Sequence, residues 1–129
     1  MHSKFYIHRD IKPENFLLGL NKNSNIVYLI DFGVSKIFYD TKKKLHIPFK
    51  DNKEFRGTIR YASINAHLGH ELSRRDDLES LGYSLILFLQ GKLPWMGIVN
   101  QNYKMSKSII ADLKKNISIE KLCSGLPGN

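Results

Sequence analysis

The chain has 129 residues, which limits it to one domain or part of one. Apolar residues make up 42% of it and charged residues 25%, close to the globular average, so a disordered or fibrous chain is excluded. The formal net charge is +8, and residues 42–60 contribute +5, from seven Lys or Arg and two Asp or Glu. Such a basic segment attracts anionic partners, but a solvated, Lys-rich surface explains the charge equally well.

Membrane and secreted classes are not indicated. The longest apolar stretches, such as residues 85–89, are too short to span a bilayer, and no apolar signal region follows Met1. The single cysteine, Cys123, excludes an intrachain disulfide and a multi-cysteine metal site. We therefore expect an intracellular protein of the cytoplasm or nucleus, without a membrane partner.

Taken in chain order, the first predicted unit is a β-hairpin. Apolar runs at 16–20 and 26–30 flank an Asn-rich turn at 21–25. Residues 31–61 then follow neither a helical nor a strand period. A long irregular stretch in a compact domain is usually functional or mobile.

The strongest helix prediction covers residues 73–89. Ser73 can cap its start, Asp76 and Asp77 lie in the first turn, where the helix dipole favours anions, and Gly91 can end it. Leucines recur at spacings of three and four, at Leu78, Leu81, Leu85 and Leu89. Because the helix is apolar nearly all round after residue 81, we expect it to be central and buried. Shorter helices are predicted at 106–113 and 119–122.

The chemical pattern lies in residues 8–15, which read HRDIKPEN, and in residues 31–33, which read DFG. Phosphoryl transfer from a nucleotide needs few protein groups, and these segments supply several. Asp10 can accept the proton of an attacking hydroxyl, and Lys12 can neutralise charge on the transferring phosphate. Asn15 and Asp31 offer the oxygen ligands that Mg²⁺ prefers, and the hairpin between them can return Asp31 to the side of Asn15. The two motifs together, in this order, predict a phosphotransferase, whereas either motif alone is a weak signal.

At this level the sequence resembles a known family. Residues 8–19 (HRDIKPENFLLG) and 28–36 (YLIDFGVSK) resemble protein kinases in general. Residues 63–65 read Ser-Ile-Asn where most kinases have Ala-Pro-Glu, which resembles the casein kinase 1 family of Ser/Thr kinases. Further segments that resemble this family are HIPF (46–49), GTIR (57–60), SRRDDLESLGY (73–83) and LPW (93–95).

The resemblance implies an α+β, protein kinase-like fold that is partial: a mainly α-helical C-terminal lobe with a small β-hairpin. Residues 1–129 are then a partial kinase domain, with a catalytic loop at 8–15, a metal-binding motif at 31–33, an activation segment at 31–65 and a central helix at 73–90. No Gly-x-Gly-x-x-Gly motif and no Val-Ala-Ile-Lys-like strand precede residue 8. We therefore expect a fragment of an active enzyme that lacks the N-terminal lobe and is inactive alone.

The resemblance also implies ATP and Mg²⁺ as cofactors and a role for each matching residue. Asp10 is the expected catalytic base, Lys12 the phosphate contact, and Asn15 and Asp31 the Mg²⁺ ligands. The remaining matches are a ribose contact through the backbone of Glu14, an adenine contact by Leu17, a hydrogen bond from Thr58 to the catalytic Asp, and a backbone anchor at Asp77. Without the family, Asp77 reads as a solvated first-turn charge.

The implied partners are proteins with an acidic or phosphorylated residue upstream of the target Ser or Thr. Arg60 matches a basic residue of the pocket that binds this anion, and Gly97 is expected beside it. Either Lys104 or Lys107 could complete the pocket. No nucleic-acid recognition motif is present, so nucleic acid is not an expected partner.

Two other functions remain open. One is a non-catalytic, truncated kinase-like binding module. The other is a small-molecule kinase of the aminoglycoside-phosphotransferase type, which Lys12, Thr58 and the long basic segment argue against. The other notable side chains have structural interpretations: His46, His67 and His70 lack metal-ligand spacing, and Trp95 and Cys123 are expected to be packing residues.

Overall fold

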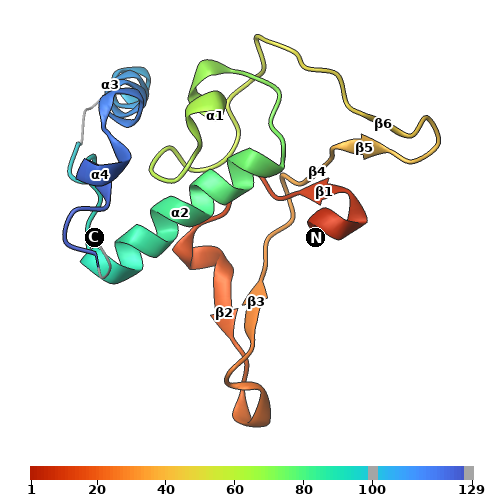
Figure 1. Ribbon diagram of the computed structural model, residues 1–129, viewed down its shortest axis with the longest axis horizontal. Helices are drawn as coiled ribbons and strands as arrows, with labels where there is room; N and C mark the ends of the chain where they lie inside the picture. Colours follow the sequence, from red (N-terminus) through yellow and green to blue (C-terminus); the bar gives the residue numbers. More distant parts are fainter. Residues whose placement is uncertain (99–101, 127–129) are drawn as a thin grey trace.

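The computed structural model describes residues 1–98 and 102–126. Small antiparallel sheets occupy the first part of the described chain, and the α-helices follow them (Figure 1). The α-helices are α1 (Ile64–Leu68), α2 (Arg74–Gln90), α3 (Tyr103–Asn116) and α4 (Ile119–Leu122). Short 3₁₀ turns cover His2–Lys4, Pro13–Asn15 and Asn21–Asn23. The predicted α+β class, mainly helical with a small hairpin, is confirmed.

Three pairs of short antiparallel strands complete the described fold. They are β1 (Tyr6–Ile7) with β4 (Lys36–Ile37), β2 (Phe16–Leu18) with β3 (Val27–Leu29), and β5 (Tyr39–Asp40) with β6 (Leu45–His46). The β2–β3 pair, in which Leu17 lies opposite Tyr28, confirms the predicted hairpin. The structure adds β4, β5 and β6 to a stretch predicted as irregular, because pairings of two residues leave no periodic pattern in a sequence.

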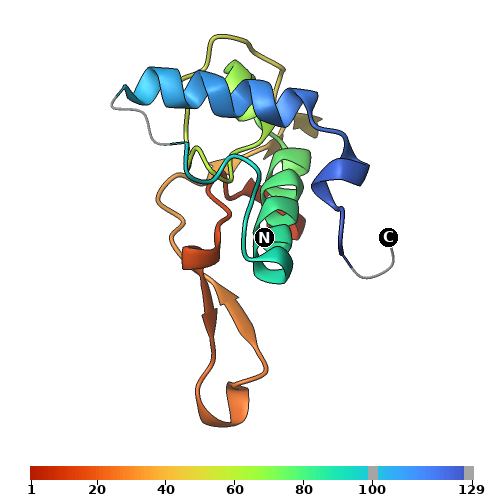
Figure 2. The same ribbon diagram turned by 90° about the vertical axis from the view of Figure 1, so that its left-hand side faces the viewer.

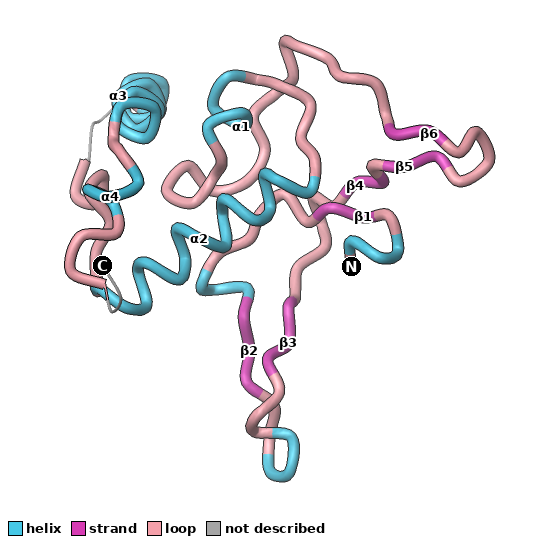
Figure 3. The backbone as a smooth tube through the Cα atoms, in the orientation of Figure 1, coloured by secondary structure: helices cyan, strands magenta, loops and turns pink. Residues whose placement is uncertain are grey.

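The segment between β6 and α1 is a long loop (Figure 3). It arches from the β5–β6 pair to the start of α1 and carries residues 47–63. Figures 1 and 2 together place α3 and the β2–β3 hairpin at opposite ends of the molecule, with α2 between them. The central position expected for this helix is therefore observed.

Local signals explain where the helices begin and end. At α2, the Ser73 amide donates to Asp76 Oδ2 at 2.7 Å in a capping box, and Gly91 ends the helix with a left-handed φ of 72°. Helix α3 starts earlier than predicted because Asn102 Oδ1 accepts the amides of residues 104 and 105. Helix α4 has the predicted bounds.

Two clusters of buried side chains hold these elements together. One joins α2 and α3 around a fully buried indole and contains Tyr61, Tyr83, Ile86, Leu93, Trp95 and Ile110. The other lies beneath β1 and α1 and contains Ile7, Phe38, Ala62, Ala66 and Leu72. Trp95 is 1% exposed, which confirms its packing role, and the half-buried Cys123 packs at the edge of the first cluster.

The expectation that α2 is buried nearly all round is wrong. Leu78, Phe88 and Leu89 are 60–65% exposed and Leu85 is 49% exposed. The buried positions of the helix are instead mostly polar, at Asp76, Asp77, Ser80, Tyr83, Ser84 and Ile86. Periodicity reports which residues are apolar, whereas their burial depends on what packs against them, and the described residues leave this apolar side largely open. No helix within residues 1–98 or 102–126 has the length and apolar character needed to cross a membrane.

Candidate active site

The predicted catalytic loop, residues 8–15, is anchored to α2 by one carboxylate. Asp77 Oδ2 accepts the main-chain amide of His8 at 2.8 Å, and its Oδ1 accepts that of Arg9 at 2.9 Å. Asp77 is 5% exposed, so the alternative of a solvated charge is wrong. Arg9 adopts a left-handed φ of 69°, and the paired amide bonds hold the backbone in that unusual conformation. The next residue in the loop is Asp10.

His8 connects the catalytic loop to the strand that precedes Asp31. Its imidazole is fully buried, and Nδ1 accepts the Asp10 amide at 3.3 Å, which leaves Nε2 to donate to Ile30 O at 2.9 Å. The His8 ring thereby joins the backbone amide of Asp10 to the carbonyl of Ile30, the residue before Asp31. In the sequence, His8 was marked only by its place in the motif, which implied no separate role for it.

The two carboxylate oxygens of Asp10 have different surroundings. Oδ2 lies 3.0 Å from Lys12 Nζ, whereas Oδ1 is buried and has no hydrogen-bond partner among the described residues. The hydrogen bond and charge of Asp10 raise the pKa of Lys12 above its usual value, so Lys12 is cationic at neutral pH. The contact with Lys12 therefore orients the Asp10 carboxylate.

Thr58 contacts Lys12, whereas a direct hydrogen bond to Asp10 was expected. Its Oγ1 accepts a hydrogen bond from Lys12 Nζ at 3.1 Å, so Lys12 links Thr58 to Asp10. Gly57, with a left-handed φ of 94°, permits this approach, because a Cβ there would lie 2.5 Å from Arg9 O. The loop around residue 58 thus packs directly on the catalytic loop.

Asn15 and Asp31 are brought side by side by the hairpin. Ile30 donates its amide to Asn15 O at 3.0 Å, which continues the β2–β3 pairing and places the next residue, Asp31, beside Asn15. Asn15 is 5% exposed and its Nδ2 donates to Asp10 O at 2.9 Å, which orients the side-chain amide. Asp31 is exposed, with a left-handed φ of 63°. An amide and a carboxylate are hard oxygen donors, so these residues fit Mg²⁺.

The two expected nucleotide contacts lie on open surface. Glu14 is exposed in the Pro13–Asn15 turn. Leu17 is 50% exposed and lines an apolar groove of about 490 Å³ between the hairpin and α2, together with Phe16, Leu81 and Phe88. The structure thus places Leu17 next to the exposed face of α2, and its contact with adenine stays a prediction.

The structure places Arg60 and Gly97 close together, as the family resemblance implied. Both line a cavity of about 440 Å³ whose other walls include Thr58, Trp95 and Tyr103. Neither candidate lysine lines this cavity. The Lys107 ammonium instead lies 4.6 Å from the centre of the Phe55 ring. Arg60 is therefore the charged side chain among the described residues that line the cavity.

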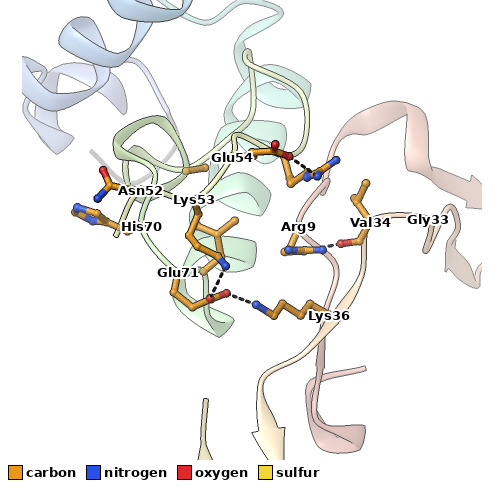
Figure 4. A pocket seen from close by; sticks show the side chains of 12 residues that line it. Arg9, Gly33, Val34, Lys36, Asn52, Lys53, Glu54, His70 and Glu71 are labelled. Carbon is orange, nitrogen blue, oxygen red and sulfur yellow. Dashed lines mark hydrogen bonds and ion pairs between the residues drawn. The ribbon is translucent and has the colours of Figure 1, made fainter. Parts of the chain in front are cut away.

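A second, larger cavity of about 650 Å³ gathers the cations Arg9, Lys36, Lys53 and Arg56 (Figure 4). Glu71, 7% exposed, lies among them, 2.6 Å from Lys36 Nζ and 3.6 Å from Lys53 Nζ. Burial acts to raise the pKa of Glu71, but the hydrogen bond and charge of Lys36, with the charge of Lys53, outweigh it and lower the pKa. Glu71 therefore ties the start of the predicted activation segment, at Lys36, to its middle, at Lys53. The basic run was visible in the sequence, but its buried counter-charge was not.

The model of the protein kinase domain family matches residues 1–124. Since the match covers nearly the whole chain, the chain belongs to the protein kinase family, whose members transfer phosphate to proteins.

Proposed function

We propose that this protein is a Ser/Thr kinase of the casein kinase 1 type, which transfers the γ-phosphate of ATP to acidic or phosphate-primed proteins. The observation that carries this proposal is the state of Asp10. Its carboxylate is held by a cationic lysine, and its backbone carbonyl accepts a hydrogen bond from Asn15 Nδ2. Such a carboxylate is oriented for an incoming hydroxyl.

The described residues divide the reaction between them. As the substrate hydroxyl oxygen bonds to the γ-phosphorus and the bond to the ADP oxygen breaks, the Asp10 carboxylate accepts the hydroxyl proton. Lys12, fixed by Asp10 and Thr58, contacts the phosphate and offsets its negative charge. Asn15 and Asp31 would hold Mg²⁺, which supplies further positive charge at the phosphates.

The casein kinase 1 assignment is supported by a contact between two of the segments that resemble this family. In the Ser-Ile-Asn segment, Ser63 Oγ donates to Asp76 Oδ1 at 2.8 Å and Asn65 Nδ2 donates to the same oxygen at 2.9 Å. Asp76 belongs to the second resembling segment, at the start of α2, and is 3% exposed. Both segments therefore form one buried polar unit that fixes the end of the activation segment.

The anionic substrate is inferred from the cavity beside Arg60. Arg60 is exposed. Gly97 leaves open space in the same cavity, because no atom lies within 4 Å of a Cβ built at that glycine. A guanidinium binds phosphate or carboxylate through charge-assisted hydrogen bonds. We therefore propose that this cavity binds the upstream acidic or phosphorylated residue of a substrate.

Kinases also need a glycine-rich loop and a strand lysine paired with a helix glutamate, which the 129 residues do not contain. We expect the chain alone to show no appreciable ATP-dependent transfer to acidic or primed peptides. Turnover by the purified chain contradicts this expectation. Joined to the N-terminal lobe of a casein kinase 1 enzyme, the chain should give Mg²⁺-dependent Ser/Thr phosphorylation. In that protein Asp10→Asn and Asp31→Asn should each abolish turnover, and activity that survives both changes rejects the proposed site.

A non-catalytic binding module is the second candidate, and the Arg60 cavity favours it, because this cavity is formed within the chain itself. The joined protein separates the two functions. Binding of primed peptides without phosphate transfer, even with the added lobe, identifies the binding module, whereas transfer identifies the enzyme.

A further inference from the structure

Lys114, on α3, is a buried lysine for which the proposed chemistry has no use. It is 3% exposed. Its Nζ donates to Ala62 O at 2.6 Å and to Ile59 O at 2.9 Å, and it lies 3.3 Å from His67 Nε2. Removing an ammonium from water costs several kcal/mol unless other groups replace the solvent. The donors of Lys114 are therefore committed to the loop that precedes α1.

Two aromatic rings complete the enclosure of this amino group, whose pKa is lowered by burial to about 7. Nζ lies 4.8 Å from the centre of the Tyr83 ring and 5.0 Å from that of Trp95, distances at which a ring attracts a cation. The indole Nε1 of Trp95 in turn donates to Arg60 O at 2.8 Å. Buried side chains from two other segments thus bind the carbonyls of residues 59, 60 and 62.

The loop held in this way carries the groups proposed to meet the substrate. The amides of Tyr61 and Ala62 both donate to Thr58 O at 2.9 Å and close a turn. On one side of the turn, the Thr58 hydroxyl bonds Lys12 of the catalytic loop. On the other, the Arg60 side chain lines the candidate anion cavity. A shift of the turn therefore moves both contacts.

We propose that Lys114 is a positioning residue for the substrate-anion cavity. By binding the Ile59 and Ala62 carbonyls, it holds the intervening Arg60 in the place from which its guanidinium meets an acidic or phosphorylated substrate residue. This inference rests on the proposed function, since it takes the Arg60 cavity as the substrate-anion site. Lys114 itself does not touch the substrate.

The test uses the whole chain and a labelled phosphoserine peptide, with the unphosphorylated peptide as reference. Fluorescence anisotropy measures affinity, and NMR hydrogen exchange measures protection of the Tyr61 and Ala62 amides. Lys114→Met should speed exchange of both amides about tenfold or more and weaken phosphopeptide binding about five- to tenfold, close to the effect of Arg60→Ala. Lys115→Met removes the same charge from the neighbouring exposed position and should leave both measurements unchanged.

Lys114→Arg keeps a buried cation with several donors and should recover part of the phosphopeptide affinity. Wild-type affinity in Lys114→Met overturns the proposal, whether or not the exchange rates change. If Lys114→Met does not fold, Lys114→Gln replaces it, because this polar side chain is one bond shorter and weakens the contacts with the Ile59 and Ala62 carbonyls. Weaker phosphopeptide binding then supports the positioning of Arg60 from beneath, and unchanged binding overturns it.

Failure of the proposed function gives a different result. In that case the wild-type chain binds both peptides equally and Arg60→Ala has no effect, which removes the anion cavity and with it the role of Lys114. If only the role of Lys114 is wrong, Arg60→Ala weakens phosphopeptide binding and Lys114→Met does not.

Discussion

Asp77 Oδ1 accepts the main-chain amide of Arg9 at 2.9 Å, across 68 positions of sequence. Its other oxygen accepts the amide of His8. The central helix therefore holds the backbone of the two residues that directly precede Asp10. The stability of the chain and the geometry of the site depend on the same buried carboxylate.

Replacing Asp77 by Asn should destabilise the chain by about 2 kcal/mol, because an amide has one oxygen where the carboxylate offers two, and its NH₂ faces backbone donors. Urea unfolding followed by circular dichroism measures the loss. Asp112→Asn, at an exposed position of α3, is the matched control and should change the free energy of unfolding by less than about 0.5 kcal/mol. Equal effects of the two substitutions contradict the anchoring role.

Gly57→Ala should destabilise the chain, because Gly57 has a φ of 94° and its Cβ would lie 2.5 Å from Arg9 O. We expect a loss of at least about 1 kcal/mol from the backbone conformation alone. Gly82→Ala is the control: Gly82 lies within α2 and nothing lies within 4 Å of its added Cβ. This change should stabilise the chain by about 0.5–1 kcal/mol. Thermal unfolding of both variants checks the opposite signs, and a stabilising Gly57→Ala rejects the close packing of residues 57 and 9.

Glu71→Gln should destabilise the chain by roughly 1–3 kcal/mol, because it removes the buried counter-charge of Lys36 and Lys53. Glu54→Gln provides the comparison. Glu54 is also paired, 2.6 Å from Arg56, but its side chain is 82% exposed, so the change should cost less than about 1 kcal/mol. Chemical unfolding at low and high salt measures both. If the Glu71 variant is as stable as the Glu54 variant, Glu71 does not tie the activation segment together.

Acid should destabilise the protein through His67. Burial, with the charge of Lys114 nearby, lowers the pKa of His67 from 6.5 to about 4. Between pH 6.5 and pH 4 the unfolded chain therefore binds a proton that the folded chain does not, so stability falls as the pH falls through this range. This titration leaves the free energy of unfolding unchanged above pH 6.5 and lowers it by roughly 3 kcal/mol at pH 4.

The His67 contribution is isolated by comparison with His67→Gln, which has no proton to bind at this position. Urea unfolding of both proteins at several pH values between 7 and 4 gives the difference. The free energy of unfolding of the wild type should fall relative to that of the variant as the pH is lowered. Parallel pH profiles show that His67 titrates normally in the folded chain.

Local features were predictable from the sequence. The central helix, the hairpin and α4 were placed from periodicity, caps and an Asn-rich turn, which act over a few neighbouring residues. The order of the Asp10 and Asp31 motifs indicated phosphotransfer because that chemistry needs these groups in these loops. The kinase family was visible for the same reason, and the family match confirms it.

Contacts between distant segments needed the tertiary structure. Lys114 looks in the sequence like its exposed neighbour Lys115, and only packing against the loop at 59–62 buries it. Thr58 reaches Asp10 through Lys12 rather than directly, and the leucines of α2 that periodicity predicts as core are largely exposed. The sequence by itself determined the local elements and the reactive groups, since these follow from short-range backbone and chemical preferences. The tertiary structure decided which charges are buried and which carbonyls they bind, because that depends on how segments far apart in the chain pack together.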